Sequence, residues 1–228
     1  MFIFPARALV RRTALGVGAA ISLALPAVAI TGPAAVAHAA GSSPIPAIRQ
    51  ALKGVTSYRA DGSLVGTGSA ITQLSIISVH KGNVAQVHAT ITQPSASGSA
   101  TAYSEIIVVG PRYCARQGAH ARFVCKTDAA TASSVAKQLD LLASFNTSAA
   151  AADSYAPTAS KTIGGQACNG YTIIKRSTKQ STGTLYVAHG SNLPCQIVSK
   201  STSGSGSNSG TITFSHYNDP SLTVGTVK

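Results

Sequence analysis

Apolar and polar residues alternate along much of this chain, a pattern that is typical of half-buried β-strands. Between residues 84 and 92, Ala85, Val87, Ala89 and Ile91 share one face, and polar residues fill most of the other. Similar strands are expected at 72–80, 103–109, 170–176, 182–189, 195–201 and 211–217. The C-terminal four are separated by short turns rich in Ser, Gly and Asn. Such connections are too short for crossover helices, so the pattern predicts an antiparallel meander.

Two segments have the spacing of helices instead. The first begins at Ser43-Pro44, where serine can cap a helix and proline suits its first turn, and it ends near Gly54. The second begins after Asp128, which can cap it, and carries an apolar stripe of Val135, Leu139 and Leu142. Residues 146–152 are expected to form a loop or a frayed second helix. The order of helix, strands, helix and strands predicts an α+β domain with one antiparallel sheet and helices packed on one face.

The first 39 residues have the parts of an export signal. Arg7, Arg11 and Arg12 are followed by an apolar, alanine-rich stretch, and the segment ends on Ala37-His38-Ala39, an A-x-A cleavage pattern. Prolines interrupt the apolar stretch, which argues against a membrane anchor. We therefore expect residues 1–39 to be a cleaved signal peptide and residues 40–228 to be one secreted or periplasmic domain. No cysteine lies at the junction, so a lipid anchor is not expected there.

The charge of the expected mature chain is basic. The full chain has 18 basic and 6 acidic residues, and removal of three signal arginines leaves 15 basic and 6 acidic residues, a net charge of +9. These basic residues are spread singly, apart from Lys175-Arg176, and no basic helix with interleaved aromatic residues is present. We therefore expect no nucleic-acid binding. We also expect the protein to be a monomer. Peripheral contact with an anionic membrane remains open on charge grounds.

Four cysteines lie in the mature part, and an even number in an oxidising compartment predicts two disulfides. Three connectivities exist. A hairpin around residues 117–120 would place Cys114 opposite Cys125, which would leave Cys168 to pair with Cys195. A zinc site is disfavoured because the spacings lack a C-x2-C pair and clustered histidines.

Catalytic motifs are missing from the sequence. The six acidic residues are widely spaced, and there is no G-x-S-x-G elbow, H-E-x-x-H pair or Walker loop. A hairpin at Lys81-Gly82-Asn83 would bring His80 and His88 together, but a metal site needs a third ligand. We therefore expect no enzyme activity, no cofactor and no metal site.

Motifs in the C-terminal third carry a family resemblance. A G-x-x-x-x-G-Y strand start ends at Tyr171, Leu193-Pro194 precedes a strand, and an F-S-x-Y-x-x-P tail runs from Phe214 to Pro220. In these motifs and in the order of its elements the chain resembles the LolA/LolB-like superfamily. This superfamily includes outer-membrane lipoprotein carriers and LppX/LprG-type lipid-binding proteins. The resemblance implies a curved, incompletely closed antiparallel barrel, with helices on its concave face and an apolar hollow for acyl chains.

The implied ligand is a lipid or another hydrophobic molecule, bound without catalysis. The candidate residues of the hollow are Leu74, Ile76, Val87, Ile107, Tyr113, Phe123, Leu139, Leu142, Tyr171, Ile173, Leu185, Val187, Ile197 and Phe214. The same side chains would also suit a solid core. In that case the chain would be a structural or interaction module of the cell surface, which uses its Ser/Thr-rich face or its sheet edge. The chain departs from the lipoprotein members because it lacks a lipidated cysteine at the signal junction.

Overall fold

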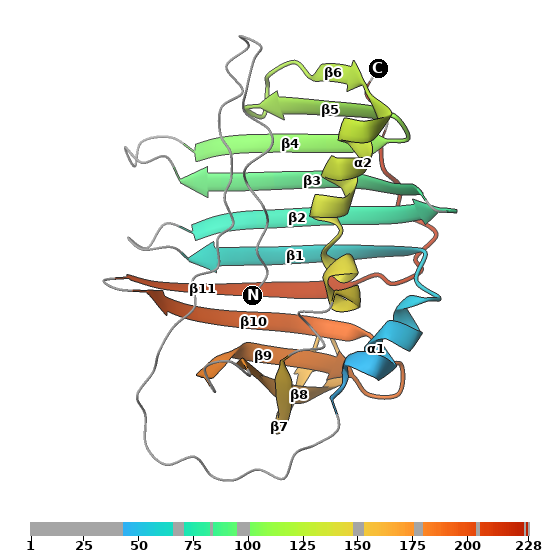
Figure 1. The fold of residues 1–228 in the computed structure, drawn as a ribbon. Coiled ribbons are helices and arrows are strands. Elements are labelled where there is room, and N and C mark those ends of the chain that lie inside the picture. Colours follow the sequence, from blue (N-terminus) through green and yellow to red (C-terminus); the bar gives the residue numbers. More distant parts are fainter. Residues whose placement is uncertain are drawn as a thin grey trace.

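A computed structural model describes residues 43–65, 71–82, 84–94, 101–147, 153–175, 180–203, 206–225 and 227 (Figure 1). The expected signal peptide lies outside these residues. The described chain forms one eleven-stranded sheet in the order β6-β5-β4-β3-β2-β1-β11-β10-β9-β8-β7, and every pairing is antiparallel. The strands are β1 (Ser57–Val65), β2 (Ile71–Lys81), β3 (Val84–Pro94), β4 (Thr101–Val109), β5 (Arg112–Gln117), β6 (Val124–Thr127), β7 (Ser154–Ile163), β8 (Gln166–Lys175), β9 (Gln180–Ala188), β10 (Pro194–Ser203) and β11 (Gly206–Ser215).

The sheet joins two meanders. Strands β1 to β6 follow one another outward to one edge, and β7 to β11 run from the opposite edge back to the centre. There β11 pairs with β1, for example through Ala60 and Phe214. The sheet is curved (Figure 1). It is not closed into a barrel, because its edge strands β6 and β7 do not pair. The predicted fold class, an α+β domain with one curved antiparallel sheet, is confirmed.

The helices lie on one face of the sheet, which we call the inner face (Figure 1). They are α1 (Ile45–Leu52), α2 (Ala129–Leu139) and the 3-10 helix η1 (Leu141–Asn146). The chain must pass from β6 at one edge to β7 at the other, and α2 and η1 make up much of this passage. Helix α2 contacts β3, β4 and β5, and η1 contacts α1. The connection therefore crosses the inner face and covers part of it.

The helix signals in the sequence are confirmed for α2 but only in part for α1. Ser43 is not the N-cap residue of α1, because that position is taken by Pro44 and has no side-chain hydrogen bond. Asp128 caps α2, and its carboxylate accepts hydrogen bonds from the backbone N–H groups of Ala130 and Thr131. The apolar stripe beyond Leu139 does not continue the same helix, however. Asp140 has an extended backbone, with φ −78° and ψ 91°, and separates α2 from η1.

The sheet bends near β9. Figure 1 shows β9, β8 and β7 turned away from the direction of the other strands. Gly183 has a φ of +154°, and a Cβ at this position would collide with the carbonyl oxygen of Val198 on β10. The pairing of β8 with β9 shifts register beside it, between Ile173 and Ile174. Only glycine permits this close approach of two backbones, so Gly183 allows the sheet to bend here.

Both disulfides follow the pairing that the hairpin argument favoured. Cys114 and Cys125 lie opposite each other on β5 and β6, and Cys168 is bonded to Cys195. The second bond connects β8 to β10 across β9, and both of its cysteines are buried beside Ala188. One disulfide therefore links the neighbouring strands β5 and β6, and the other links β8 and β10, which lie on either side of β9.

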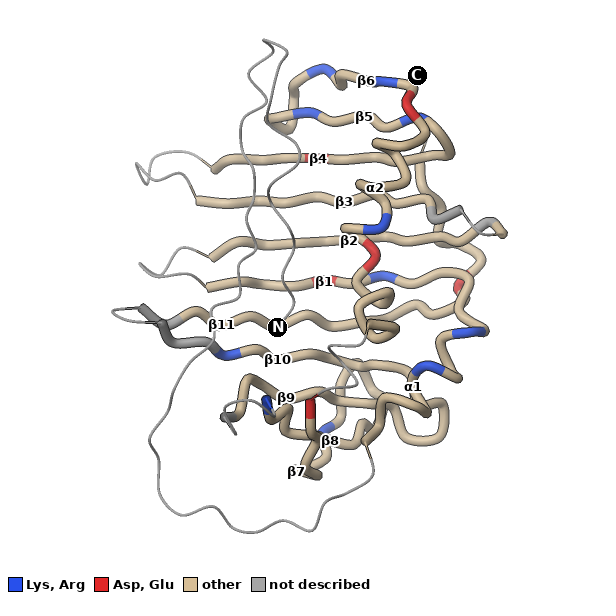
Figure 2. The backbone as a smooth tube through the Cα atoms, viewed as in Figure 1, with Lys and Arg blue, Asp and Glu red and all other residues tan. Residues whose placement is uncertain are grey.

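Basic residues do not gather into a patch on the described chain. Figure 2 shows Lys and Arg distributed singly along the described chain, for example on β5 and β6. Among the described residues, no helix is long and apolar enough to cross a membrane.

Candidate functional site

The inner face of the sheet is a continuous apolar surface. Alternation along each strand sends every second side chain to this face, and the register aligns these side chains across the strands. Val87 lies opposite Val108, Ile76 opposite Ala89, and Leu185 opposite Ile197. Among the described residues, every strand except β6 contributes to the resulting cluster.

Small and apolar residues on the helices cover part of this surface. Ile45 and Ile48 of α1 are almost completely buried, and so are Ala132 and Ala136 of α2. The two alanines allow α2 to lie close to β3 and β4. Leu142 and Phe145 of η1 are also buried in the cluster. The covered part of the inner face is therefore filled by protein side chains.

The junction between α2 and η1 is fixed to the sheet by a buried tyrosine. The hydroxyl of Tyr58 on β1 donates to Asp140 Oδ1 at 2.9 Å and accepts from the backbone N–H of Leu141 at 2.9 Å. Burial, followed by the nearby Asp140 carboxylate, raises the pKa of Tyr58 well above its ordinary value. The hydroxyl therefore remains a donor at all physiological pH values. His80 Nε2 lies 3.7 Å from Asp140 Oδ2 at the same junction.

A second polar contact connects the two helical segments. The guanidinium of Arg49 on α1 donates from Nε to the carbonyl oxygen of Phe145 and from Nη2 to that of Thr147, both at 2.8 Å. These carbonyls belong to the end of η1, where the helix leaves acceptors unpaired. Tyr58 thus holds the N-terminal end of η1, and Arg49 holds its C-terminal end.

Replacing Tyr58 by phenylalanine is expected to lower the free energy of unfolding by about 2 kcal/mol, because Asp140 loses a donor and the N–H of Leu141 loses its acceptor. Amide exchange of Leu141 should become faster. Tyr171→Phe is the matched control, since its half-buried ring lies on the same face and its hydroxyl makes no hydrogen bond among the described residues. Denaturant titration and hydrogen exchange measure both effects. Equal losses in the two variants would contradict the role assigned to the Tyr58 hydroxyl.

The cluster is not fully enclosed. Tyr171 and Ile173 of β8, Ile197 of β10 and Ile212 of β11 belong to it but are only partly buried. Three of them lie in one row across the sheet, in which Ile212 is the register partner of Ile197 and the buried Leu185 of β9 lies between Ile197 and Tyr171. This row leaves apolar surface accessible on the β8–β11 part of the inner face.

Most of the sequence-predicted candidates occupy the inner face. Seven are buried in the cluster: Leu74, Ile76, Val87, Leu142, Leu185, Val187 and Phe214. Five more are partly buried against it: Tyr113, Leu139, Tyr171, Ile173 and Ile197.

The other two candidates, Ile107 and Phe123, lie outside the cluster. Ile107 is buried, but it points to the outer face, because its neighbours Ile106 and Val108 take the inner positions. The ring of Phe123 lies under the guanidinium of Arg116, 4.7 Å away. Neither side chain therefore lines the inner face.

The candidate residues of the hollow did not include several inner-face residues. Tyr58, Ala60, Ala89 and Val108 are fully buried there. The alternation of residues 84–92 already indicated Ala89. Strand β1 alternates too, with Arg59 and Asp61 on the face opposite Tyr58 and Ala60, but Ala60 and Gly62 are too small to mark an apolar face clearly.

The histidine pair considered from the sequence does not form. His80 lies opposite Ala85, whereas His88 lies opposite Ile77, so the two imidazoles point to opposite faces. His88 instead contacts Glu105 on the outer face at 2.7 Å. No group of three or more metal-ligating side chains occurs among the residues that the structure describes.

Comparisons with known proteins bear on the fold. No protein-family model matches the sequence, and no match is found among curated proteins. The solved structure of LprF from Mycobacterium bovis is similar at a TM-score of 0.54 and 12% identity, over 80% of this chain and 94% of LprF.

Two further solved structures are more distant. The MucA/MucB complex of Pseudomonas aeruginosa gives a TM-score of 0.42 at 14% identity, over 80% of this chain and 60% of that one. The LolA superfamily protein NE2245 from Nitrosomonas europaea gives 0.26 at 8% identity, over 77% of this chain and 92% of that one. The similarity to LprF over nearly its full length, together with the open antiparallel sheet, shows that this chain has the LolA/LppX-like fold predicted from its C-terminal motifs.

Proposed function

We propose that this chain is an exported, non-catalytic binder or carrier of a hydrophobic ligand, either a lipid or the acyl chains of a lipoprotein. The observation that carries the proposal is the apolar inner face, which extends across both meanders and is only partly covered by three short helices. A binding site of this kind needs contiguous apolar surface and a means of access. The chemistry of the inner face suits acyl chains, which require burial from water but few hydrogen bonds.

Access to the face follows from the way the helices are held. Between β6 and β7 the described chain is held by polar contacts to Tyr58 and Arg49 and by the buried apolar side chains of α2 and η1. None of these contacts belongs to the strand ladders, so we propose that α2 and η1 can move away from the sheet without disturbing it. A ligand that enters at the partly exposed row on β8–β11 would then extend into the space that η1 leaves.

The positive net charge of the expected mature chain supports a role in the cell envelope. A net charge of +9 favours approach to anionic headgroups through many weak contacts rather than one patch. Peripheral contact with an anionic membrane is part of the proposal, and so is export through removal of residues 1–39. The protein would act as a monomer and without a cofactor.

Ligand content is the direct test. Residues 40–228, exported into an oxidising compartment and purified without detergent, should carry lipid that native mass spectrometry detects, and the delipidated protein should take up a fluorescent fatty acid. Ile197→Asn should weaken uptake about tenfold, because it places an amide on the apolar face.

Val198→Asn is the matched control, since Val198 is the next residue of β10, is similarly half-buried, and points to the outer face. Its affinity for the fatty acid should remain within about twofold of that of the unmodified protein. Absence of both bound lipid and uptake in the unmodified protein would exclude the proposal. Equal weakening by the two variants would exclude the inner face as the site.

A further inference from the structure

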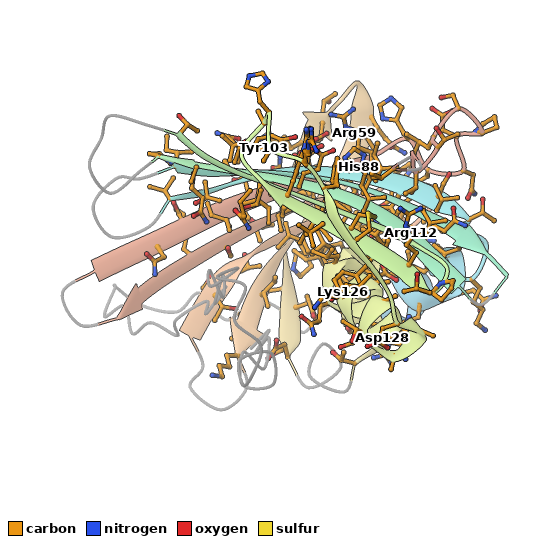
Figure 3. The ribbon with its side chains drawn as sticks, turned by 90° about the horizontal axis from the view of Figure 1, so that it is seen from above. Arg59, His88, Tyr103, Arg112, Lys126 and Asp128 are labelled. Carbon is orange, nitrogen blue, oxygen red and sulfur yellow. A yellow bond between two sulfur atoms is a disulfide. The ribbon has the colours of Figure 1, made fainter. Side chains whose placement is uncertain are left out.

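The outer face of the sheet, opposite the helices, carries a groove of about 390 Å³. Figure 3 shows this face from the side, with Arg59, His88 and Tyr103 pointing away from α2. The groove crosses four adjacent strands, β3, β2, β1 and β11. With neighbouring strands about 4.8 Å apart, it spans about 14 Å across the sheet.

Hydroxyl and amide groups dominate the lining. The polar side chains that define it include Ser63, Gln73, Thr90, Thr92 and Thr211. Register brings them together on one face, since Ser63 is the partner of both Gln73 and Thr211, and Gln73 is the partner of Thr92. Among the described residues, these five side chains make no hydrogen bond, so their donors and acceptors are available to a ligand.

Among the described residues that line the groove, the one carboxylate is already neutralised. Asp61 accepts from Arg59 Nε at 2.8 Å, from Arg59 Nη2 at 3.1 Å and from the Ser75 hydroxyl at 2.7 Å. Burial raises the pKa of Asp61, but the hydrogen bonds from Arg59 and Ser75 and the Arg59 charge outweigh it, so the pKa lies below its ordinary value. Asp61 is therefore ionised at neutral pH, and its charge is balanced by Arg59. No other charged side chain is found among the described residues that line the groove.

These features discriminate between classes of ligand. A peptide strand cannot add to this part of the sheet, because the four strands are central and their backbones are paired on both sides. An anionic ligand would need an unpaired cation, and Arg59 is engaged by Asp61. The mixed donor and acceptor capacity of hydroxyl groups is instead matched by a ligand that itself carries many hydroxyls.

We propose that this outer groove is a second binding site, specific for a neutral oligosaccharide, on the face of the sheet opposite the apolar surface. The hydroxyls and the Gln73 amide would pair with sugar hydroxyls, and Asp61 would accept from them with the lone pairs that Arg59 and Ser75 leave open. The length of the groove suits a short stretch of a glycan rather than a single sugar. The site stands independently of lipid binding, since none of its functional side chains reaches the inner face.

The test uses amide chemical shifts of the mature chain, residues 40–228, titrated separately with maltotriose, cellotriose and triacetylchitotriose. At least one of these neutral trisaccharides should shift amides of β1, β2, β3 and β11 in a saturable way. Thr90→Val together with Thr92→Val should weaken that binding about tenfold, because two hydroxyls that hydrogen-bond the ligand are lost. Valine keeps the shape of threonine and suits a strand, so the fold should persist, and thermal unfolding checks this.

The matched control is Thr172→Val together with Thr184→Val. These residues are register partners on the outer face of β8 and β9, away from the groove, and both are half-buried. This control should bind within about twofold of the unmodified chain. The proposal is overturned if none of the trisaccharides shifts these amides, if the groove variant binds normally, or if heparin disaccharide shifts the same amides more strongly. Fatty-acid uptake measured on the same samples reports on the inner face alone, so failure of one site is distinguishable from failure of the other.

Discussion

Glu105→Gln is expected to lower the free energy of unfolding by about 3 kcal/mol at pH 7, since it removes the charge from a buried, fully paired carboxylate. Glu105 is 6% exposed. Its carboxylate accepts from His88 Nε2 at 2.7 Å, from the Tyr103 hydroxyl at 2.9 Å and from Arg116 Nε at 2.6 Å. The amide would leave the Arg116 guanidinium, only partly exposed between the rings of Tyr103 and Phe123, without its counter-charge.

The loss of stability caused by Glu105→Gln should become smaller at low pH. Burial raises the pKa of Glu105, but the hydrogen bonds from Tyr103, Arg116 and His88 and the Arg116 charge outweigh it and leave the pKa below its ordinary value. A carboxyl group with a lowered folded-state pKa stabilises the fold above its unfolded-state pKa, about 4.3, and this stabilisation is lost as the pH falls through the folded-state value. Urea titrations should therefore show the difference between the two proteins shrinking below about pH 4.

Asp61→Asn is the matched control for a paired carboxylate. Its ion pair with Arg59 is about half exposed on both sides, at 42% and 47%, so its loss should cost less than about 1 kcal/mol. A cost for Glu105→Gln that is equally small, or one that does not change with pH, would show that the buried network contributes no charge-dependent stability.

Removing the second disulfide by Cys168→Ala together with Cys195→Ala is expected to lower the free energy of unfolding by about 3.5 kcal/mol. The bond closes a loop of 27 residues, and the entropy that it removes from the unfolded chain corresponds to about this value. The same bond joins β8 to β10 across β9 and is buried at both ends. Its loss should therefore also raise hydrogen exchange in β7 and β8, next to the open edge of the sheet.

Cys114→Ala together with Cys125→Ala is the comparison. The Cys114–Cys125 bond joins residues 11 positions apart, so its removal should lower the free energy of unfolding by about 2.8 kcal/mol. The increase in amide hydrogen exchange should be confined to β5 and β6. Guanidinium titration and amide exchange measure the two pairs. If the Cys168–Cys195 variant were as stable as the unmodified chain, the bond would not constrain the unfolded state as proposed.

The sequence predicted the architecture because alternation and short turns leave few options for antiparallel strands. It predicted the face of a strand only where the alternation was clean. In residues 84–92 the alternation correctly predicts that Val87, Ala89 and Ile91 share the buried face. In the run Ile106-Ile107-Val108-Val109 both faces are apolar, so nothing in the pattern distinguishes the two, and Ile107 was placed on the wrong one.

Other features depend on contacts between residues that are distant in sequence. The break between α2 and η1 at Asp140 accompanies a hydrogen bond from Tyr58, 82 positions away, which no local signal reveals. Strand β7 contains proline and many exposed polar residues, so its sequence lacks the apolar alternation of an internal strand. It is an edge strand, where proline and polar side chains are tolerated. The outer groove likewise results from register between β3, β2, β1 and β11.

The central pairing of β1 with β11 also affects when the molecule can fold. Arg59 and Ser215 are neighbours in the sheet although 156 positions separate them in the chain. Each meander can assemble from local contacts, but the two cannot join until the last strand has been synthesised. Until β11 is available, the N-terminal meander is an incomplete sheet in which β1 is unpaired on one side. An unpaired strand edge of this kind can pair with another chain, so aggregation of the incomplete protein is expected to begin at β1.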